Sequence, residues 1–320
     1  MSTLFPHVGQ HLFVGIPGKE LTPGTRRWLN DIQPGGVILF ARNIGTAGEL
    51  RALGRALRTE LKYRPLLAID QENGRVNRLR EIAGELPTIA ELKREGSVEK
   101  VEEFGRSTGR WLHQFCVDID FAPVFDLELT DADNALRDRC WGKTAAEVIT
   151  WAGAFLEGLE REGVTGCPKH FPGLGAAMLD SHDKLPMIGR SREELLREDL
   201  QPYRHFMRRL TAVMVSHGLY PAFDNQPASL SRIVINDLLR RQLGFTGLVF
   251  TDDLEMGAIE SFEKAVVDAI HAGADMLLVC HTPEKAVAAQ EILAKLPAER
   301  FIESQKRIQQ FRDEWIGHKV

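Results

Sequence analysis

Short apolar runs recur along the whole chain, and each is followed by a longer and more polar stretch. Eight runs of about four or five residues span 12–15, 36–40, 66–69, 117–121, 164–167, 212–216, 247–251 and 275–279. Most of them are continuously apolar, which is typical of parallel β-strands covered on both faces. The run at 117–121 is the exception, because Asp118 and Asp120 alternate with apolar residues.

The polar stretches between the runs carry start signals for helices. Thr46, Thr144 and Ser191 are each followed three residues later by a glutamate, which is the pattern of a capping box. Pro23 and Pro283 stand where a first helical residue is expected. Eight strands alternating with eight helices predict an α/β protein with a single (β/α)8 TIM-type barrel. The alternative, an open doubly wound sheet, would often show a GxGxxG loop after its first strand, and that pattern does not occur there.

Composition narrows the classes of function. The chain has 320 residues, of which 43% are hydrophobic and 27% are charged, and its net charge is −5. We expect one catalytic domain over 1–320, with a C-terminal helix at about 300–316 packed on the barrel. The acidic balance gives no support to a nucleic-acid partner. No apolar run reaches the ~18 residues of a membrane span, and the start lacks the features of a signal peptide.

Ionisable residues follow several of the predicted strands. Asp70 comes after the third strand, Lys169 and His170 after the fifth, His217 after the sixth and Asp252 after the seventh. Active sites of (β/α)8 barrels lie at the C-terminal ends of the strands, so these side chains are expected at one rim.

The loop at 169–186, KHFPGLGAAMLDSHDKLP, is rich in ionisable groups. Its glycines and prolines argue against a regular helix. Asp180 and His182 are two residues apart in it, and a carboxylate can fix the tautomer of an imidazole and raise its basicity. The simpler alternative is a turn that contains an incidental histidine. Lys169 and His170 could likewise form a structural ion-pair node.

Three other segments offer candidate groups. The carboxylate of Asp252 is placed either for chemistry or as a helix N-cap, a role that Asp253 or Glu255 could fill instead. The segment 70–79, DQENGRVNRL, supplies acceptors and fork-shaped donors that a hydroxyl-rich ligand needs, or it is a solvated helix start. Its candidates are Asp70, Arg75 and Arg78, around Gly74. Arg139 lies in the long connection at 122–143, and ordered loops of that length are usually functional.

With these residues the chain resembles glycoside hydrolase family 3, in particular its single-domain bacterial β-N-acetylglucosaminidases. The resemblance covers nearly the whole chain. It rests on GGVILFARNI at 35–44, DQENGRVNRL at 70–79, VDIDFAPVFDL at 117–127, KHFPGLG…DSH…LP at 169–186 and LGFTGLVFTDDLEMGAI at 243–259. The family fold is a TIM-type barrel, in agreement with the strand count.

The resemblance implies a retaining exo-glycosidase that releases terminal β-linked N-acetylglucosamine. Asp252 corresponds to the nucleophile, and His182, partnered by Asp180, to the general acid and base. The residues implied to bind the terminal sugar are Asp70, Arg78, Arg139, Lys169 and His170. No metal and no organic cofactor are implied. The expected substrate is a small carbohydrate, an N-acetylglucosamine-containing muropeptide of cell-wall recycling, and the expected enzyme is a cytoplasmic monomer.

The chain departs from the family pattern at a few positions. Leu174 replaces the second histidine of KHFPGHG, Asn73 stands where glycine is usual, and Cys140-Trp141 replaces Ser-Phe. Leu174 bears on the hydrogen bonding of the loop, and we expect Trp141 to narrow or reshape the sugar site.

Other functions stay open at this point. The same family could use phosphate in place of water, or accept other β-glycosides. A metal-dependent amidohydrolase could use His170, His182, His217 and Asp252, although the HxH pair that such sites usually need after the first strand is missing. A Schiff-base aldolase could use Lys169. A barrel that only binds sugar is the non-enzymatic alternative.

Overall fold

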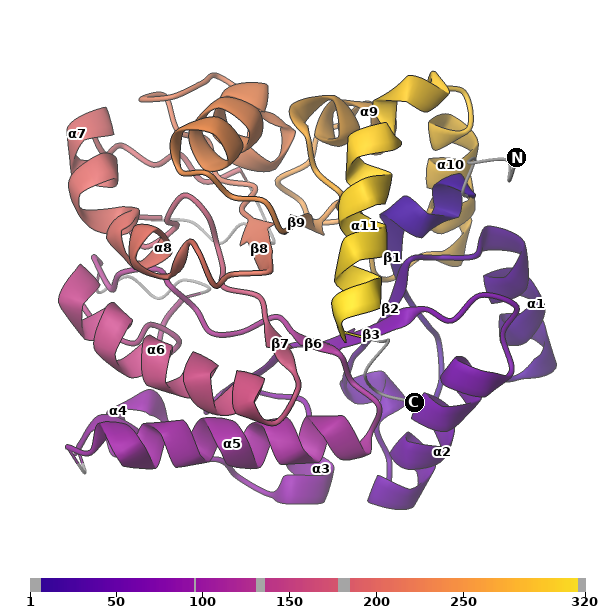
Figure 1. Cartoon of the computed structure of the whole chain (residues 1–320), viewed down its shortest axis with the longest axis horizontal. Coiled ribbons are helices and arrows are strands. Elements are labelled where there is room, and N and C mark those ends of the chain that lie inside the picture. Colours follow the sequence, from indigo (N-terminus) through magenta and orange to yellow (C-terminus); the bar gives the residue numbers. More distant parts are fainter. Residues whose placement is uncertain (1–6, 95, 131–135, 178–184, 316–320) are drawn as a thin grey trace.

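The protein was analysed as a computed structural model, which describes residues 7–94, 96–130, 136–177 and 185–315. Eight parallel strands form one sheet in the order β7-β6-β3-β2-β1-β10-β9-β8. They are β1 (Leu12–Gly15), β2 (Gly36–Leu39), β3 (Leu66–Ile69), β6 (Ile119–Asp120), β7 (Thr165–Gly166), β8 (Ala212–Val215), β9 (Leu248–Asp253) and β10 (Met276–Val279). The backbone N–H of Phe171 donates to the carbonyl of Met214 and joins the two ends of the sheet. The predicted TIM-type barrel is therefore confirmed (Figure 1).

Helices surround the strands on the outside (Figure 1). The longer ones are α1 (Pro23–Ile32), α2 (Ala47–Thr59), α5 (Val98–Gln114), α6 (Ala145–Arg161), η5 (Ile233–Gln242), α9 (Phe262–Ala272), α10 (Pro283–Leu293) and α11 (Ile302–Trp315). The shorter ones are α3 (Arg80–Ala83), α4 (Ile89–Arg94), α7 (Arg192–Glu194) and α8 (Gln201–Phe206). The three predicted capping boxes are present at the starts of α2, α6 and α7. Pro23 and Pro283 begin α1 and α10 as expected.

Two local expectations differ from the structure. The predicted strand at 117–121 is reduced to the two residues of β6, although Asp118 and Phe121 on either side of it still donate backbone N–H groups to Leu67 and Ile69 of β3. The segment 70–79 is not a helix start. It forms a small antiparallel hairpin, β4 (Gln71–Asn73) and β5 (Val76–Asn77), whose turn needs the positive φ of Gly74 (+47°).

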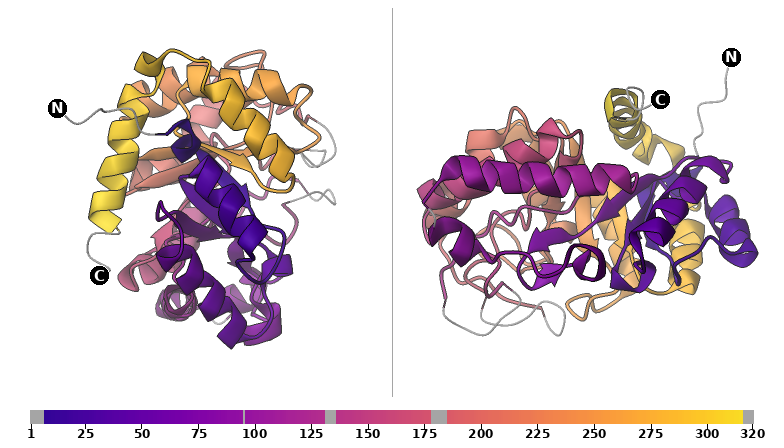
Figure 2. Two further views of the ribbon diagram at one scale, coloured as in Figure 1. Left: turned by 90° about the vertical axis from the view of Figure 1, so that its right-hand side faces the viewer. Right: turned by 90° about the horizontal axis from the view of Figure 1, so that it is seen from below.

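The inside of the barrel is filled by side chains and closed at one end. Phe13, Phe121 and Phe250 meet edge to face with ring centroids 5.3–6.0 Å apart. Ile308 and Phe311 of α11 belong to the same apolar cluster. Arg307 of α11 binds Asp275, directly before β10, so α11 covers the N-terminal ends of the strands (Figures 1 and 2). Access to the barrel is therefore from the C-terminal ends.

Within the described ranges, no helix combines the length and the apolar character needed to cross a bilayer.

Candidate active site

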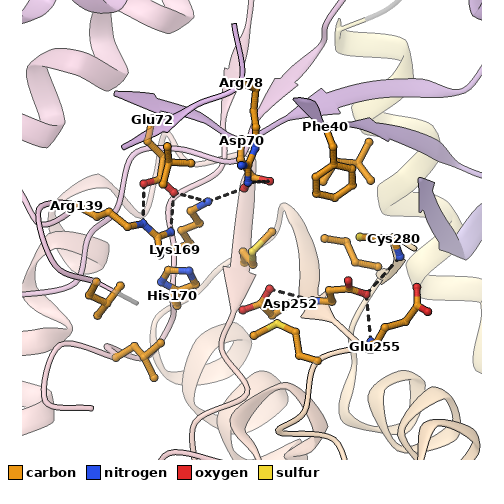
Figure 3. Close-up of a pocket in the computed structure, with 18 of the residues that line it drawn as sticks. Phe40, Asp70, Glu72, Arg78, Arg139, Lys169, His170, Asp252, Glu255 and Cys280 are labelled. Atoms are coloured by element: carbon orange, nitrogen blue, oxygen red, sulfur yellow. Dashed lines mark hydrogen bonds and ion pairs between the residues drawn. The ribbon is translucent and has the colours of Figure 1, made fainter. Parts of the chain in front are cut away.

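A cavity of about 340 Å³ opens at the C-terminal ends of the strands (Figure 3). This volume is at the lower end of the range for small-molecule sites. Its ionisable lining consists of Asp70, Glu72, Arg75, Arg78, Arg139, Lys169, His170, Asp252, Asp253, Glu255, Cys280 and His281. Six of the eight residues predicted from the sequence therefore lie around one cavity. The other two, Asp180 and His182, lie outside the described residues.

One wall of the cavity is a cluster of buried ion pairs. Nζ of Lys169 lies 2.6 Å from Oδ1 of Asp70 and 2.8 Å from Oε1 of Glu72. Arg139 donates to both oxygens of Glu72, from Nε at 2.8 Å and from Nη2 at 2.6 Å. This bidentate geometry fixes the orientation of the guanidinium. Figure 3 shows the four side chains linked in a row toward the centre of the cavity.

The fold explains why these groups meet. Asp70 directly follows β3, and the β4–β5 hairpin places Glu72 two residues further on the same side of the extended chain. Lys169 follows β7, and Arg139 comes from the connection between β6 and α6. Three separate segments thus supply one cluster.

The opposite charges in the cluster stabilise one another in their ionised forms. Burial opposes ionisation of Glu72, but Arg139 and Lys169 outweigh it and hold the pKa of this carboxyl well below its usual range. Burial would also lower the pKa of Lys169, but Asp70 and Glu72 outweigh it and raise that pKa. Glu72 and Lys169 are therefore both charged at neutral pH, and a ligand meets a fixed array of donors and acceptors.

His170 is oriented by a carboxylate that the sequence analysis did not single out. Nδ1 of His170 lies 2.6 Å from Oδ2 of Asp126, and Oδ1 of Asp126 accepts the backbone N–H of Leu174 at 2.6 Å. Asp126 is buried. The loop hydrogen bond at position 174 is thus made by the backbone, so it does not need a histidine side chain. The Leu174 side chain is buried and lines the cavity.

A second wall carries arginine and aromatic groups. Arg78 lies with Nη2 3.9 Å from Oδ2 of Asp70, and its guanidinium is 5.8 Å from the ring centroid of Phe40. Arg75, from the hairpin turn, also lines the cavity. Fork-shaped donors beside an aromatic ring suit a ligand that has both hydroxyl groups and an apolar face.

Asp252 stands on the opposite side of the cavity from the ion-pair cluster, near the end of β9 (Figure 3). Its Oδ1 accepts the backbone N–H of Asp253 at 2.9 Å. The alternative role as a helix N-cap is wrong, because the next helix, α9, is capped by Ser261. Asp252 is half-buried and faces the cavity, where a carboxylate can approach a bound ligand.

The carboxylates that follow Asp252 support the neighbouring turn. Oδ1 of Asp253 accepts the backbone N–H of Glu255 and that of Cys280. Glu255 accepts the N–H groups of His281 and Thr282 through Oε2, at 2.6 and 3.1 Å. The two side chains therefore stabilise the turn between β10 and α10, which completes the rim beside Asp252.

Among the described histidines, His217 is held by protein partners on both ring nitrogens. His217 is fully buried, with Nδ1 2.6 Å from Oγ of Ser229 and Nε2 2.9 Å from the carbonyl of Asp253, so both ring nitrogens are already used. In the part of the chain that the structure describes, no group of three or more His, Cys, Asp or Glu side chains is placed to hold a metal ion. The observed role of His217 is to hold the backbone next to Asp252.

The expectation that Trp141 shapes the sugar site is wrong. Trp141 is buried and packs against Phe155 of α6 at 5.7 Å between ring centroids. It is not among the residues that line the cavity, whereas Arg139, two residues earlier, is. Asn73 is buried at the end of β4, beside the hairpin turn.

Glu72 and Asp126 are the two functional candidates that sequence reasoning missed. Asp126 ends the apolar run FAPVFD at 121–126, whereas Glu72 stands in the polar segment DQEN at 70–73. A carboxylate at the end of an apolar run is seldom buried unless it is paired, so the position of Asp126 was a usable signal, whereas that of Glu72 was not.

Comparisons with known proteins identify the family of the chain. Residues 7–311 match the glycosyl hydrolase family 3 N-terminal domain. The β-hexosaminidase of Idiomarina loihiensis is 35% identical over 295 residues, which cover 90% of this chain and 88% of that protein. A β-hexosaminidase of Thiobacillus denitrificans is 38% identical over 300 residues, which cover 89% of this chain and 81% of that protein.

Solved structures give the same result. The family 3 β-N-acetylglucosaminidase from Paenibacillus sp. str. FPU-7 has a TM-score of 0.92 at 33% identity. The match covers 98% of this chain and 62% of that longer chain. NagZ from Neisseria gonorrhoeae, solved in complex with N-trifluoroacetyl-D-glucosamine, has a TM-score of 0.81 at 30% identity. That match covers 94% of this chain and 93% of the other. The resemblance seen in the sequence is confirmed, and the chain belongs to glycoside hydrolase family 3.

Proposed function

We propose that this chain, a glycoside hydrolase with β-N-acetylhexosaminidase activity, is a retaining exo-enzyme that releases terminal β-linked N-acetylglucosamine. The observation that carries the proposal is the cavity at the C-terminal rim. Across this cavity the strand-end carboxylate of Asp252 faces the ion-pair cluster, whose charged groups suit the hydroxyl groups of a sugar. The N-trifluoroacetyl-D-glucosamine bound to the gonococcal relative supports an N-acylated glucosamine as the ligand.

In this mechanism Asp252 attacks the anomeric carbon and forms a covalent glycosyl-enzyme through an oxocarbenium-like transition state. Its placement at the end of β9, with the adjacent backbone held by His217, suits a nucleophile that must not move during attack. Water then releases the sugar with overall retention of configuration.

The charged wall orients the sugar before bond breaking. Asp70 and Glu72 offer acceptors, whereas Lys169, Arg139 and Arg78 offer donors, so adjacent hydroxyl groups can each find a partner. Because the ion pairs already fix these side chains, they lose little conformational freedom when the substrate binds. His170 completes the set and is held by Asp126.

We assign the general acid and base to His182, with Asp180 as the carboxylate that supports it. This assignment rests on the family resemblance and on the spacing of the two residues, since both lie outside the described residues. His182 protonates the leaving oxygen in the first step and deprotonates water in the second.

As the cellular role we propose the trimming of N-acetylglucosamine from anhydromuropeptides in the cytoplasm, by a monomer. The support is the family resemblance and the likeness to NagZ.

A panel of p-nitrophenyl β-glycosides tests the proposed specificity. The N-acetylglucosaminide should be cleaved at least about 100-fold faster than the glucoside or xyloside, because the sugar site selects at the transition state. The same assay with added phosphate separates the phosphorylase alternative, which would form N-acetylglucosamine 1-phosphate. Faster cleavage of the glucoside, or a phosphorylated product, would overturn the proposal.

A further inference from the structure

A second cavity, of about 230 Å³, lies at the N-terminal ends of the strands, away from the active site. Its walls come from the last turns of α2, from the residues before β3 and from the residues before β6. The basic residues in the lining are Arg55, Arg58, Arg64 and His113, and the single carboxylate in the lining is Asp118. A cavity with this charge balance attracts an anion.

Asp118 is already committed to the protein. Its Oδ2 accepts from Nη2 of Arg58 and from the backbone N–H of Leu67, the latter at 2.9 Å. Arg58 also donates to the carbonyls of Cys116 at 2.7 Å and Pro65 at 3.2 Å. Asp118 and Arg58 therefore neutralise one another, and they form a fixed, hydrogen-bonded floor.

Arg64 adds a positive charge that this pair does not balance. Its Nε is buried and has no hydrogen-bond acceptor among the described residues. Arg312 of α11 stacks over Tyr63 at 4.4 Å and donates from Nη2 to the carbonyl of Arg64 at 2.7 Å, while its Nη1 is likewise buried without an acceptor. Burial, together with the guanidinium of Arg58, lowers the pKa of Arg64. Arg55 is exposed at the rim of the cavity.

The geometry points to a phosphate-binding site in this cavity, for inorganic phosphate or for the phosphate group of a small phosphate monoester. Guanidinium forks match the oxygens of phosphate, and a dianion balances the excess charge of Arg55 and Arg64. The volume is several times the ~30 Å³ share of one water, yet below the ~300 Å³ of a drug-sized site.

Isothermal titration calorimetry at low ionic strength tests the site, with inorganic phosphate and with phenyl phosphate as probes. The variants are Arg64→Gln and Arg55→Gln, and both leave the Arg58–Asp118 pair intact. Arg208→Gln is the matched control, because Arg208 is an exposed arginine after α8. Cleavage of an aryl N-acetylglucosaminide is measured for each protein, since the cavity does not adjoin the active site.

We expect saturable binding to the wild-type protein, at least about tenfold weaker binding to Arg64→Gln, and weaker binding to Arg55→Gln. Arg208→Gln should bind like the wild type, and kcat/KM should be unchanged in all variants. Tighter binding of phenyl phosphate would identify a monoester as the ligand, whereas tighter binding of inorganic phosphate would identify the free ion. The proposal would be overturned by the absence of saturable binding, or by equal affinity in the wild type, Arg64→Gln and Arg55→Gln. Either result would show that these arginines have a structural role only.

Discussion

Lys169 and Glu72 form a buried ion pair, with Nζ 2.8 Å from Oε1 and neither side chain more than 4% exposed. Glu72 also binds Arg139, so one carboxylate holds two cations at the wall of the active-site cavity. Breaking a buried pair leaves an uncompensated charge, which costs far more than the pair itself contributes. Glu72 is thus the residue on which the geometry of this wall depends.

Replacing Glu72 by Gln should affect both stability and catalysis. Loss of the shared carboxylate leaves Lys169 and Arg139 without their common partner. We expect the free energy of unfolding to fall by about 3–5 kcal/mol and kcat/KM to fall by at least about 100-fold. Urea unfolding and aryl N-acetylglucosaminide kinetics measure the two effects. Glu291→Gln, an exposed control, should stay within about 0.5 kcal/mol of wild type.

The stability difference between the wild type and Glu72→Gln should also depend on pH. Although burial opposes ionisation, Arg139 and Lys169 keep the folded-state pKa of Glu72 below the unfolded value of about 4.3. Ionised Glu72 therefore stabilises the fold fully above that value, and its contribution declines as the pH falls through the folded pKa. The stability difference should be constant from about pH 6 to 8 and shrink below about pH 4.5. A difference that grows on acidification contradicts this electrostatic account.

Much of the barrel was predictable because buried parallel strands leave continuous apolar runs. All eight strands fall within the predicted ranges or within two residues of them, and helix starts followed from local capping at Thr46, Thr144 and Ser191. The β4–β5 hairpin was not predicted, because its short polar strands have no periodic signal and depend on the turn at Gly74.

The site was predictable only as far as its residues follow strand ends. Asp70, Lys169 and Asp252 were found in this way. Glu72 and Asp126 were missed because their burial depends on partners that are distant in the sequence: Arg139 and Lys169 for Glu72, and His170 for Asp126. Such long-range pairing is set by the tertiary fold, so the local sequence does not show which partner each carboxylate has.

Asp126 should act by positioning His170. The carboxylate of Asp126 accepts the backbone N–H groups of His170 and Leu174 and lies next to Nδ1 of His170. In Asp126→Asn one of these two acceptor oxygens is replaced by an NH₂ donor. We expect kcat/KM to fall by about 10- to 100-fold, with a changed His170 tautomer in ¹⁵N NMR spectra. The exposed variant Asp31→Asn should change neither. An unchanged tautomer together with a loss of activity would argue against the positioning role.

The acid role of His182 predicts a dependence on the leaving group. His182→Ala should slow substrates with leaving groups of high pKa by about 10²–10⁴-fold, and activated aryl glycosides much less, because the latter need no protonation. Asp180→Ala should show the same trend with smaller losses. A series of substituted phenyl N-acetylglucosaminides gives the slope of log kcat/KM against leaving-group pKa. An equal loss for every substrate would contradict the assignment.

The retaining mechanism requires that Asp252 forms a covalent bond to the sugar. That intermediate can be trapped with a ring-fluorinated N-acetylglucosaminyl fluoride, because the fluorinated glycosyl-enzyme is hydrolysed slowly. Peptide mass spectrometry then identifies the modified residue. We expect one added sugar per chain, located on Asp252, and no adduct in Asp252→Asn. An adduct on another residue, or an α-configured first product with no adduct, would contradict it.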